Sequence, residues 1–192
     1  METTNIMIVG VGGQGSLLAS KLLGHLFLNE GYDVKVSEVH GMSQRGGSVV
    51  TYVRFGDKVY SPVIDKGEAD YIVSFELLEA ARWLPWLKKG GRIVTNTQTI
   101  DPMPVITGAM EYPKDIEETL RAYAKVRLVK AGELAVEAGN TRTANVVLLG
   151  AMAAAGSIPK ETWISALKDT VPERFLEVNL KAFDLGYAAA EA

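Results

Sequence analysis

Short apolar runs alternate with amphipathic segments over the first part of the chain. Residues 6–9 form an apolar run of strand length that ends at a glycine. From residue 16 to residue 29, leucines and a phenylalanine recur every three or four positions, which predicts a helix that stops at Gly31. Valines over residues 34–39 indicate a second strand. The order strand, glycine turn, helix and strand predicts a βαβ unit with a right-handed crossover.

The pattern changes after this unit. Residues 48–55 and 58–63 are rich in β-formers and are separated by Gly56-Asp57, which predicts an antiparallel hairpin. Further apolar runs of strand length predict strands at residues 71–74, 92–95 and 126–129. Segments with helical periodicity predict helices at residues 76–89 and 115–124. The remainder is predicted to be helical, with helix starts near Thr141, Pro159 and Pro172.

These patterns predict an α/β fold. We expect a Rossmann-like three-layer arrangement with a mostly parallel sheet, an antiparallel hairpin and a helical C-terminal part. The chain has 192 residues, no internal repeat and no linker long enough to divide it, so a single domain over residues 1–192 is the expectation.

Composition narrows the class of protein. The chain is 47% hydrophobic and 22% charged, as in ordinary globular domains. Its net charge of −3 gives no basic footprint for nucleic acid or an anionic membrane. The longest weakly polar stretch, residues 146–158, falls short of the ~18 apolar residues that a membrane span needs. We therefore expect a cytoplasmic protein whose partners include neither nucleic acid nor membrane.

The absence of cysteine limits the redox chemistry of this chain. Without cysteine it can form no disulfide, thiolate nucleophile, cysteine-ligated iron–sulfur cluster or cysteine zinc site. The only histidines are His25 and His40, and neither lies within a spaced acidic cluster, so no metal site is expected. Redox chemistry would have to come from a cofactor or another chain.

A glycine-rich segment follows the first predicted strand and precedes the first predicted helix. Such a loop lets the backbone approach an anion, and the helix behind it points its free N–H groups at the anion. No lysine follows the last glycine, so the phosphate loop of nucleoside triphosphatases is not matched. The candidate cofactor-binding residues are Gly10, Gly12, Gly13, Gln14 and Gly15.

Two other interpretations of this segment remain open. The glycines can serve only a tight turn between strand and helix. In the other alternative the ligand is NAD, because Glu38 lies 23 positions after Gly15, close to the end of the second predicted strand, where the ribose-binding acid of nicotinamide-binding folds sits.

A second glycine-rich segment, HGMSQRGG at residues 40–47, follows the second predicted strand. Its candidate catalytic residues are His40, Ser43, Gln44 and Arg45. An imidazole titrates near ~6.5 and can act as acid or base, and a guanidinium can pair with an anionic group through two hydrogen bonds. A solvated turn and a partner-facing loop are the alternatives.

Four segments in order resemble one known family. They are VGVGGQGSLLASKLLG (residues 9–24), EVHGMSQRGGSVVTYVRFG (residues 38–56), NTRTANVVLLGA (residues 140–151) and VPERFLEVNLKAFDLG (residues 171–186). Together they resemble the gamma-type domain of the 2-oxoacid:ferredoxin oxidoreductases, and in particular its indolepyruvate branch, in which this domain is the small beta subunit. The resemblance spans nearly the whole chain.

The resemblance implies a heteromeric, oxygen-sensitive enzyme of anaerobic metabolism. Such enzymes decarboxylate an aryl 2-oxoacid on thiamine diphosphate, pass two electrons through iron–sulfur clusters to ferredoxin and transfer the aryl-acetyl group to coenzyme A. The thiamine and the clusters belong to the large partner subunit, so this chain would be the accessory subunit and inactive alone.

The resemblance also suggests where this chain contributes. The glycines of the first loop would receive an anionic group of coenzyme A, and Ser43, Gln44 and Arg45 would face the subunit interface near the reactive centre. Two other functions remain open at this point: a stand-alone NAD-binding oxidoreductase and a non-catalytic assembly module on the same fold.

Overall fold

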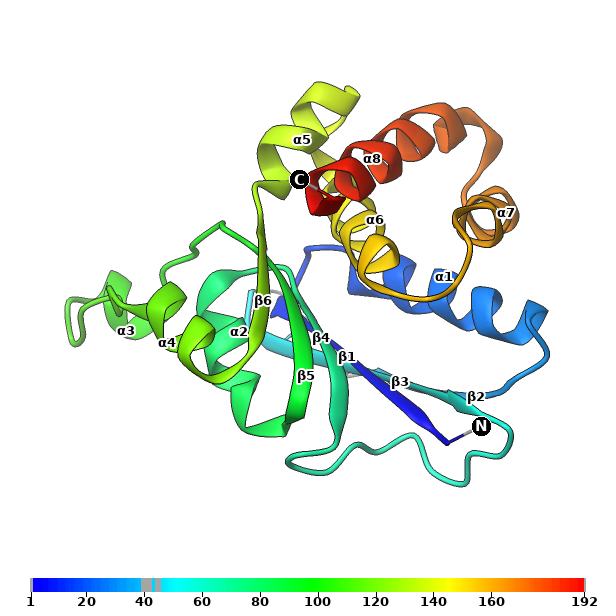
Figure 1. The fold of residues 1–192 in the computed structure, drawn as a ribbon. Helices are drawn as coiled ribbons and strands as arrows, with labels where there is room; N and C mark the ends of the chain where they lie inside the picture. The colour runs from blue at the N-terminus through cyan, green and yellow to red at the C-terminus, as the bar shows by residue number, and fades with distance from the viewer. Residues whose placement is uncertain (1, 39–42, 44–45, 192) are drawn as a thin grey trace.

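The computed structural model describes residues 2–38, 43 and 46–191, and within them the chain forms a six-stranded sheet in the order β2-β3-β1-β4-β5-β6 (Figure 1). The strands are β1 (Thr4–Val11), β2 (Asp33–Glu38), β3 (Ser48–Gly56), β4 (Ala69–Ser74), β5 (Leu87–Asn96) and β6 (Lys125–Val129). Strand β3 is antiparallel to both of its neighbours, and β1, β4, β5 and β6 are parallel. The sheet is therefore mostly parallel, as predicted.

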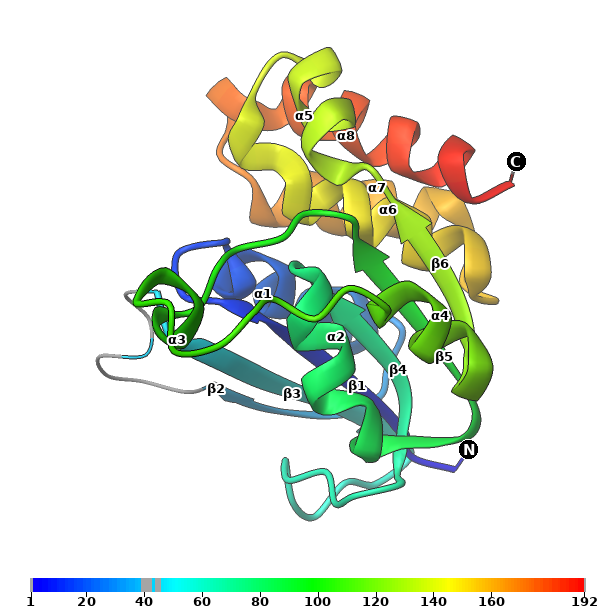
Figure 2. The same cartoon turned by 90° about the vertical axis from the view of Figure 1, so that its left-hand side faces the viewer.

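Helices cover both faces of the sheet. They are α1 (Ser16–Asn29), α2 (Leu77–Trp83), α3 (Met103–Ile106), α4 (Ile116–Tyr123), α5 (Ala131–Ala138), α6 (Ala144–Ala155), α7 (Lys160–Thr170) and α8 (Glu173–Glu191). Figures 1 and 2 show α2 and α4 on one face, α1 and α6 on the other, and α5, α7 and α8 around α6. The predicted three-layer α/β fold is confirmed.

The side chains of strand β1 show why helices pack on both faces of the sheet. Successive side chains of a strand point to opposite faces. Ile6 and Ile8 belong to the core with α1 and α6, whereas Met7 and Val9 belong to the core with α2 and α4. All four are almost fully buried, so the strand reads in sequence as a continuous apolar run rather than an alternating one.

The predicted hairpin between residues 48–55 and 58–63 is wrong. Strand β3 pairs with β1 along one edge and with β2 along the other, which leaves no edge for residues 58–63. Side chains satisfy their backbone groups instead: the Val59 N–H donates to the Asp33 carboxylate at 2.9 Å, and the carbonyls of Ser61 and Val63 accept from Arg54. The antiparallel ribbon is formed by β2 and β3.

The helix predicted over residues 76–89 is shorter than expected. Helix α2 ends at Trp83, a 3-10 turn (η2) spans Leu84–Trp86, and β5 begins at Leu87. Pro85 has no N–H to continue the helical ladder, which explains the stop. The helix predicted over residues 16–29 matches α1, and the element predictions for residues 92–95, 115–124 and 126–129 fall on β5, α4 and β6.

The C-terminal third is helical, as predicted. The Thr141 start is a 3-10 turn, η3 (Thr141–Thr143), which runs into α6, and Pro159 and Pro172 immediately precede α7 and α8. Among the helices that the structure describes, none has both the length and the apolar character needed to cross a membrane.

Candidate functional site

The glycine-rich loop connects β1 to α1 at the carboxyl edge of the sheet. Gly13 and Gly15 have φ angles of +101° and +90°, in the left-handed region that glycine adopts without a steric penalty. Gly15 is the N-cap of α1, and no side chain caps this helix. The first turn of α1 is thus presented as a site of partial positive charge, the arrangement that binds anions at helix N-termini.

Gln14 fastens the loop to the sheet. Its Oε1 accepts a hydrogen bond from the Val11 N–H at 2.7 Å, and its Nε2 donates to the Phe75 carbonyl at 3.0 Å. The same amide nitrogen lies 3.4 Å from Oε1 of Gln98. A Cβ on Gly10 would come within 2.8 Å of Gln14 Oε1 and 3.0 Å of the Phe75 Cβ, so a larger residue there would displace the Gln14 amide. The Gln14 amide therefore positions the loop.

Asn145, at the start of α6, ties this helix to the same loop. Its Nδ2 donates to the Gly15 carbonyl at 3.1 Å, and its Oδ1 accepts from the Val146 N–H at 2.9 Å. The side chain is buried, and a Cβ on Gly15 would come 2.6 Å from its Nδ2. Asn145 is absent from the candidate site residues of the sequence analysis; its signal is its place in the third family segment, residues 140–151.

A cavity of about 610 Å³ lies between the glycine-rich loop, the end of β5 and the start of α6. Its polar lining includes Asn96, Gln98 and Arg142, and none of its described lining residues is acidic. The full lining is Gly13, Gln14, Gly15, Leu18, Phe75, Asn96, Gln98, Thr141, Arg142, Ala144, Asn145 and Leu148. Arg142 and the uncapped start of α1 line the same cavity, a combination that suits a ligand with an anionic group.

Buried Asn96 lines this cavity and connects neighbouring segments through hydrogen bonds. Its Oδ1 accepts from the Ala131 N–H at 3.2 Å, and its Nδ2 lies 3.3 Å from both the Phe75 carbonyl and Gln98 Oε1. This one amide therefore links the ends of β4 and β5 to the first residue of α5. Like Asn145, it follows from tertiary packing and was not among the predicted site residues.

A second cavity, of about 320 Å³, lies on the other side of the loop. It is lined by Gly12, Gly13, Gly15, Ser16, Leu17, Glu38, Val49 and Thr51. Glu38, the candidate ribose-binding acid, does reach this cavity from the end of β2, but its carboxylate accepts a hydrogen bond from the Ser20 hydroxyl. Strand β3 separates β2 from β1, unlike the usual dinucleotide-binding sheet, where these two strands are neighbours.

The second glycine-rich segment touches the first. The Gly47 N–H donates to the Ser43 carbonyl at 2.9 Å, and the Gly12 N–H donates to the Gly47 carbonyl at 2.9 Å. Ser43 is thus two backbone hydrogen bonds away from the glycine-rich loop. His40, Gln44 and Arg45 lie outside the described residues, and their predicted roles stay predictions. Within the described residues there is no cluster of three or more potential metal ligands.

Comparisons with known proteins bear out the resemblance. The model of the pyruvate ferredoxin/flavodoxin oxidoreductase family matches residues 5–189. The indolepyruvate oxidoreductase subunit IorB of Pyrococcus horikoshii is 48% identical over 100% of this chain and 98% of its own length. The subunit of the same name from Methanothermobacter thermautotrophicus is 41% identical over 97% of each chain.

A solved structure shares the fold. The gamma subunit of a keto/oxoacid ferredoxin oxidoreductase from Geobacter sulfurreducens superposes with a TM-score of 0.73 at 25% identity, over 98% of both chains. Sequence and structure agree over almost the whole length of the protein. The chain therefore belongs to the pyruvate ferredoxin/flavodoxin oxidoreductase family.

Proposed function

We propose that this chain is the accessory subunit of an indolepyruvate, or more broadly arylpyruvate, ferredoxin oxidoreductase. The complex would convert an aryl 2-oxoacid and coenzyme A to aryl-acetyl-CoA and carbon dioxide, with two electrons passed to ferredoxin. The observation that carries the proposal is the 48% identity, over the whole chain, to a relative named as an indolepyruvate oxidoreductase subunit.

The division of labour follows from the side chains available. The chain has no cysteine, so iron–sulfur clusters held by cysteine belong to another subunit. Thiamine diphosphate, which supplies the decarboxylation chemistry, would also be held by that large subunit. This chain would be inactive alone, and the assembled complex would work in the cytoplasm.

The larger cavity is the proposed place for an anionic group of coenzyme A. Three features support this: the uncapped first turn of α1, the Arg142 guanidinium and a volume of about 610 Å³ without an acidic lining residue. The loop residues Gly10, Gly12, Gly13, Gln14 and Gly15 shape the wall, with Gln14 as a positioning residue. Backbone N–H groups at the helix start would donate to phosphate oxygens.

The loop with His40, Ser43, Gln44 and Arg45 is the proposed contribution to the subunit interface near the reactive centre. Its support is the hydrogen-bonded connection from Ser43 through Gly47 to Gly12, which holds the two glycine-rich segments at one edge of the sheet. A guanidinium there would pair with an anionic substrate group.

The direct test is an anaerobic dye-reduction assay that depends on both arylpyruvate and coenzyme A. It compares this chain alone, the large subunit alone and the two mixed. Activity only in the mixture is the expected result. An inactive mixture together with tight NAD binding by this chain alone would favour the dinucleotide-dependent alternative, with Glu38 as its ribose ligand.

Two substitutions test the residues. Arg142→Ala in the assembled complex should raise the KM for coenzyme A about tenfold, and leave the KM for arylpyruvate unchanged, because a charge-assisted hydrogen bond is worth about 1.5–3 kcal/mol. Arg127→Ala, at the far edge strand β6, is the matched control. Arg45→Ala should reduce turnover while the subunit stays folded; unchanged kinetics for either site variant would reject its role.

A further inference from the structure

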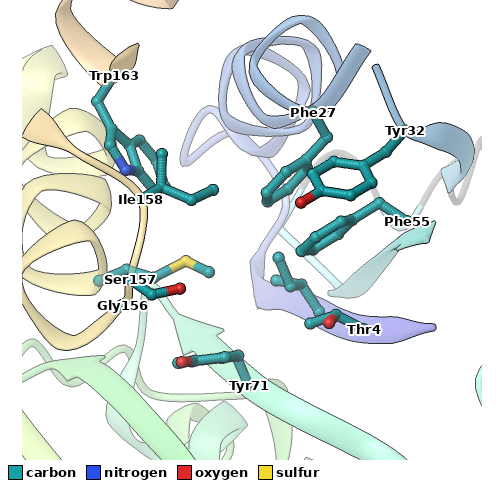
Figure 3. Close-up of a pocket in the computed structure, with 11 residues that line it drawn as sticks. Thr4, Phe27, Tyr32, Phe55, Tyr71, Gly156, Ser157, Ile158 and Trp163 are labelled. Carbon is teal, nitrogen blue, oxygen red and sulfur yellow. The ribbon is translucent and has the colours of Figure 1, made fainter. Parts of the chain in front are cut away.

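A basic cavity of about 460 Å³ lies beside the edge strand β6. Strands β4 and β5 separate β6 from β1, which carries the glycine-rich loop. The β6 cavity differs from the one in Figure 3, where aromatic side chains such as Phe27 and Phe55 gather and no described lining residue is ionised at neutral pH. The β6 cavity is lined by Arg92, Ile93, Val94, Arg121, Lys125, Val126, Arg127, Leu128 and Ala155.

Three of the four cations in this lining share one face of the sheet. In the parallel pairing of β5 with β6, Arg92 lies beside Lys125, and Val94 lies beside Arg127. Val94 belongs to the core with α1 and α6, and side chains two positions apart in a strand point to the same face. Neighbouring strands lie about 5 Å apart and alternate residues of a strand about 7 Å apart, so the three like charges are held close enough to repel one another.

Arg92 has a fixed place in this group. One of its guanidinium nitrogens donates a hydrogen bond to the carbonyl of Ala155, the last residue of α6. The last carbonyls of a helix have no partner within the helix and favour a nearby cation. A guanidinium has five N–H donors, so others remain for a ligand. The fourth cation, Arg121, lines the cavity from α4, which covers the other face of the sheet (Figure 2).

No counter-charge accompanies the four cations. None of the described lining residues is acidic, and no ion pair within the described part of the chain involves any of the four. Basic residues on an edge strand can keep other strands away, which would account for Lys125 and Arg127. It does not account for Arg92, on the inner strand β5, or for Arg121, on a helix. Their convergence on one cavity, in a chain with a net charge of −3, indicates a site for an anion.

We propose that the β6 cavity binds a compact phosphate polyanion with a terminal diphosphate, either inorganic pyrophosphate or the end of a nucleoside diphosphate. Three of the four cations are arginines, and a guanidinium pairs with phosphate oxygens through two hydrogen bonds. Cations about 5–7 Å apart are spaced too widely for one phosphate to contact all of them, whereas two linked phosphates reach further. A terminal phosphate also loses its second proton near pH ~6, which adds negative charge at pH 7.

Isothermal titration calorimetry of the full chain at low ionic strength tests the proposal, because the four side chains are exposed and salt screens their charges. Pyrophosphate and ADP should each bind about tenfold more tightly than sulfate or AMP, since the second phosphate adds charge-assisted hydrogen bonds. The tighter of the two identifies the source: pyrophosphate for a free diphosphate, ADP for a nucleotide. Equal affinity for sulfate and pyrophosphate would show only a general attraction of anions and would overturn the proposal.

Charge substitutions locate the site. Lys125→Glu should weaken pyrophosphate binding about tenfold or more, because it replaces an attraction by a repulsion, and Arg121→Gln should weaken it about two- to fivefold, the range for an exposed charge pair. Lys168→Glu in α7 is the matched control, because Lys168 is exposed, lies outside the cavity lining and gives the same change in net charge. It should bind pyrophosphate as the parent protein does.

Arg142→Ala separates the β6 cavity from the proposed coenzyme A cavity, which can also attract anions. The β6 site should keep its affinity for pyrophosphate in this variant, whether or not the chain has its proposed function in the assembled complex. Circular dichroism checks that each variant is folded. Pyrophosphate binding that is unchanged in Lys125→Glu, or lost in Arg142→Ala but retained in Lys125→Glu, would contradict the proposed site.

Discussion

The side-chain amide of Asn145 donates to the carbonyl of Gly15, 130 residues earlier in the chain, at 3.1 Å. This hydrogen bond joins the start of α6 to the N-cap of α1, so that two helix N-termini meet the same cavity. The shape of the proposed coenzyme A site depends on this contact, because Gly15 fixes where the first turn of α1 points.

Gly15→Ala should therefore destabilise the protein by about 2–3 kcal/mol. The φ angle of +90° strains any L-residue, and a Cβ would come 2.6 Å from Nδ2 of Asn145. Gly13→Ala is the matched control, because Gly13 has a similar φ of +101° but nothing within 4 Å of its Cβ, so only the backbone cost of about 1 kcal/mol remains. Urea unfolding measures both; equal losses would show that the Asn145 contact adds nothing.

Gly186→Ala should be among the most damaging single substitutions, with a loss of ~3 kcal/mol or more. Helices α6 and α8 pack so closely that a Cβ on Gly186 would overlap the Val147 carbonyl. Overpacking against backbone cannot be relieved by a rotamer change. Gly132→Ala in α5 has nothing within 4 Å and should instead stabilise by up to about 1 kcal/mol. Thermal unfolding of the two variants should shift in opposite directions.

Asp33 should contribute an acid-sensitive part of the stability. A hydrogen bond from the Lys35 ammonium, followed by one from the Val59 N–H, lowers the pKa of Asp33 from 3.8 to about 2. A carboxyl group whose pKa is lower in the folded state than in the unfolded state stabilises the protein at pH values above the unfolded-state pKa. This stabilisation is lost as the pH falls from about 4 through about 2.

Asp33→Asn should consequently be less stable than the parent protein at pH 7, with a difference that shrinks between pH 4 and pH 2. Urea midpoints at several pH values provide the measurement. Asp115→Asn is the control, since the side chain of Asp115 makes no capping hydrogen bond at α4. A difference that stays constant down to pH 2 would contradict the proposed role of the ionised Asp33 carboxylate.

Tyr112 should make the protein sensitive to alkali. Its hydroxyl donates to the buried Glu76 carboxylate at 2.7 Å, and burial, followed by this hydrogen bond, raises the pKa of Tyr112 above its usual value of 10.0. A tyrosine whose pKa is raised in the folded state contributes its full stabilisation at pH values below ~10. This contribution is lost as the pH rises from there toward the pKa of the folded state.

Tyr112→Phe should lose about 1–2 kcal/mol at pH 7, because Glu76 loses a donor, and its deficit relative to the parent protein should shrink above pH ~10. Tyr60→Phe, at a position that is 89% exposed, should unfold as the parent protein does. Denaturant midpoints between pH 7 and pH 11 supply the comparison. A pH-independent deficit would argue against titration of Tyr112.

Local patterns in the sequence were sufficient for most elements. The leucine spacing over residues 16–29 predicted α1 to the residue, and the apolar run at residues 6–9 predicted a strand buried on both faces. The glycine-rich motif predicted the turn between β1 and α1, and α1 begins directly after it. These features depend on backbone propensity and on the period of side-chain burial, which neighbouring residues define by themselves.

Only the tertiary structure decided the order of the strands. Residues 58–63 have the composition of a strand, but β3 is already paired on both edges, so they remain outside the sheet. Asn96, Asn145 and Arg142 gather around the glycine-rich loop because β5 and α6 end or begin beside it. The sequence pattern indicates which face of a helix or strand is buried. Which distant segments pack against that face depends on how the whole chain folds.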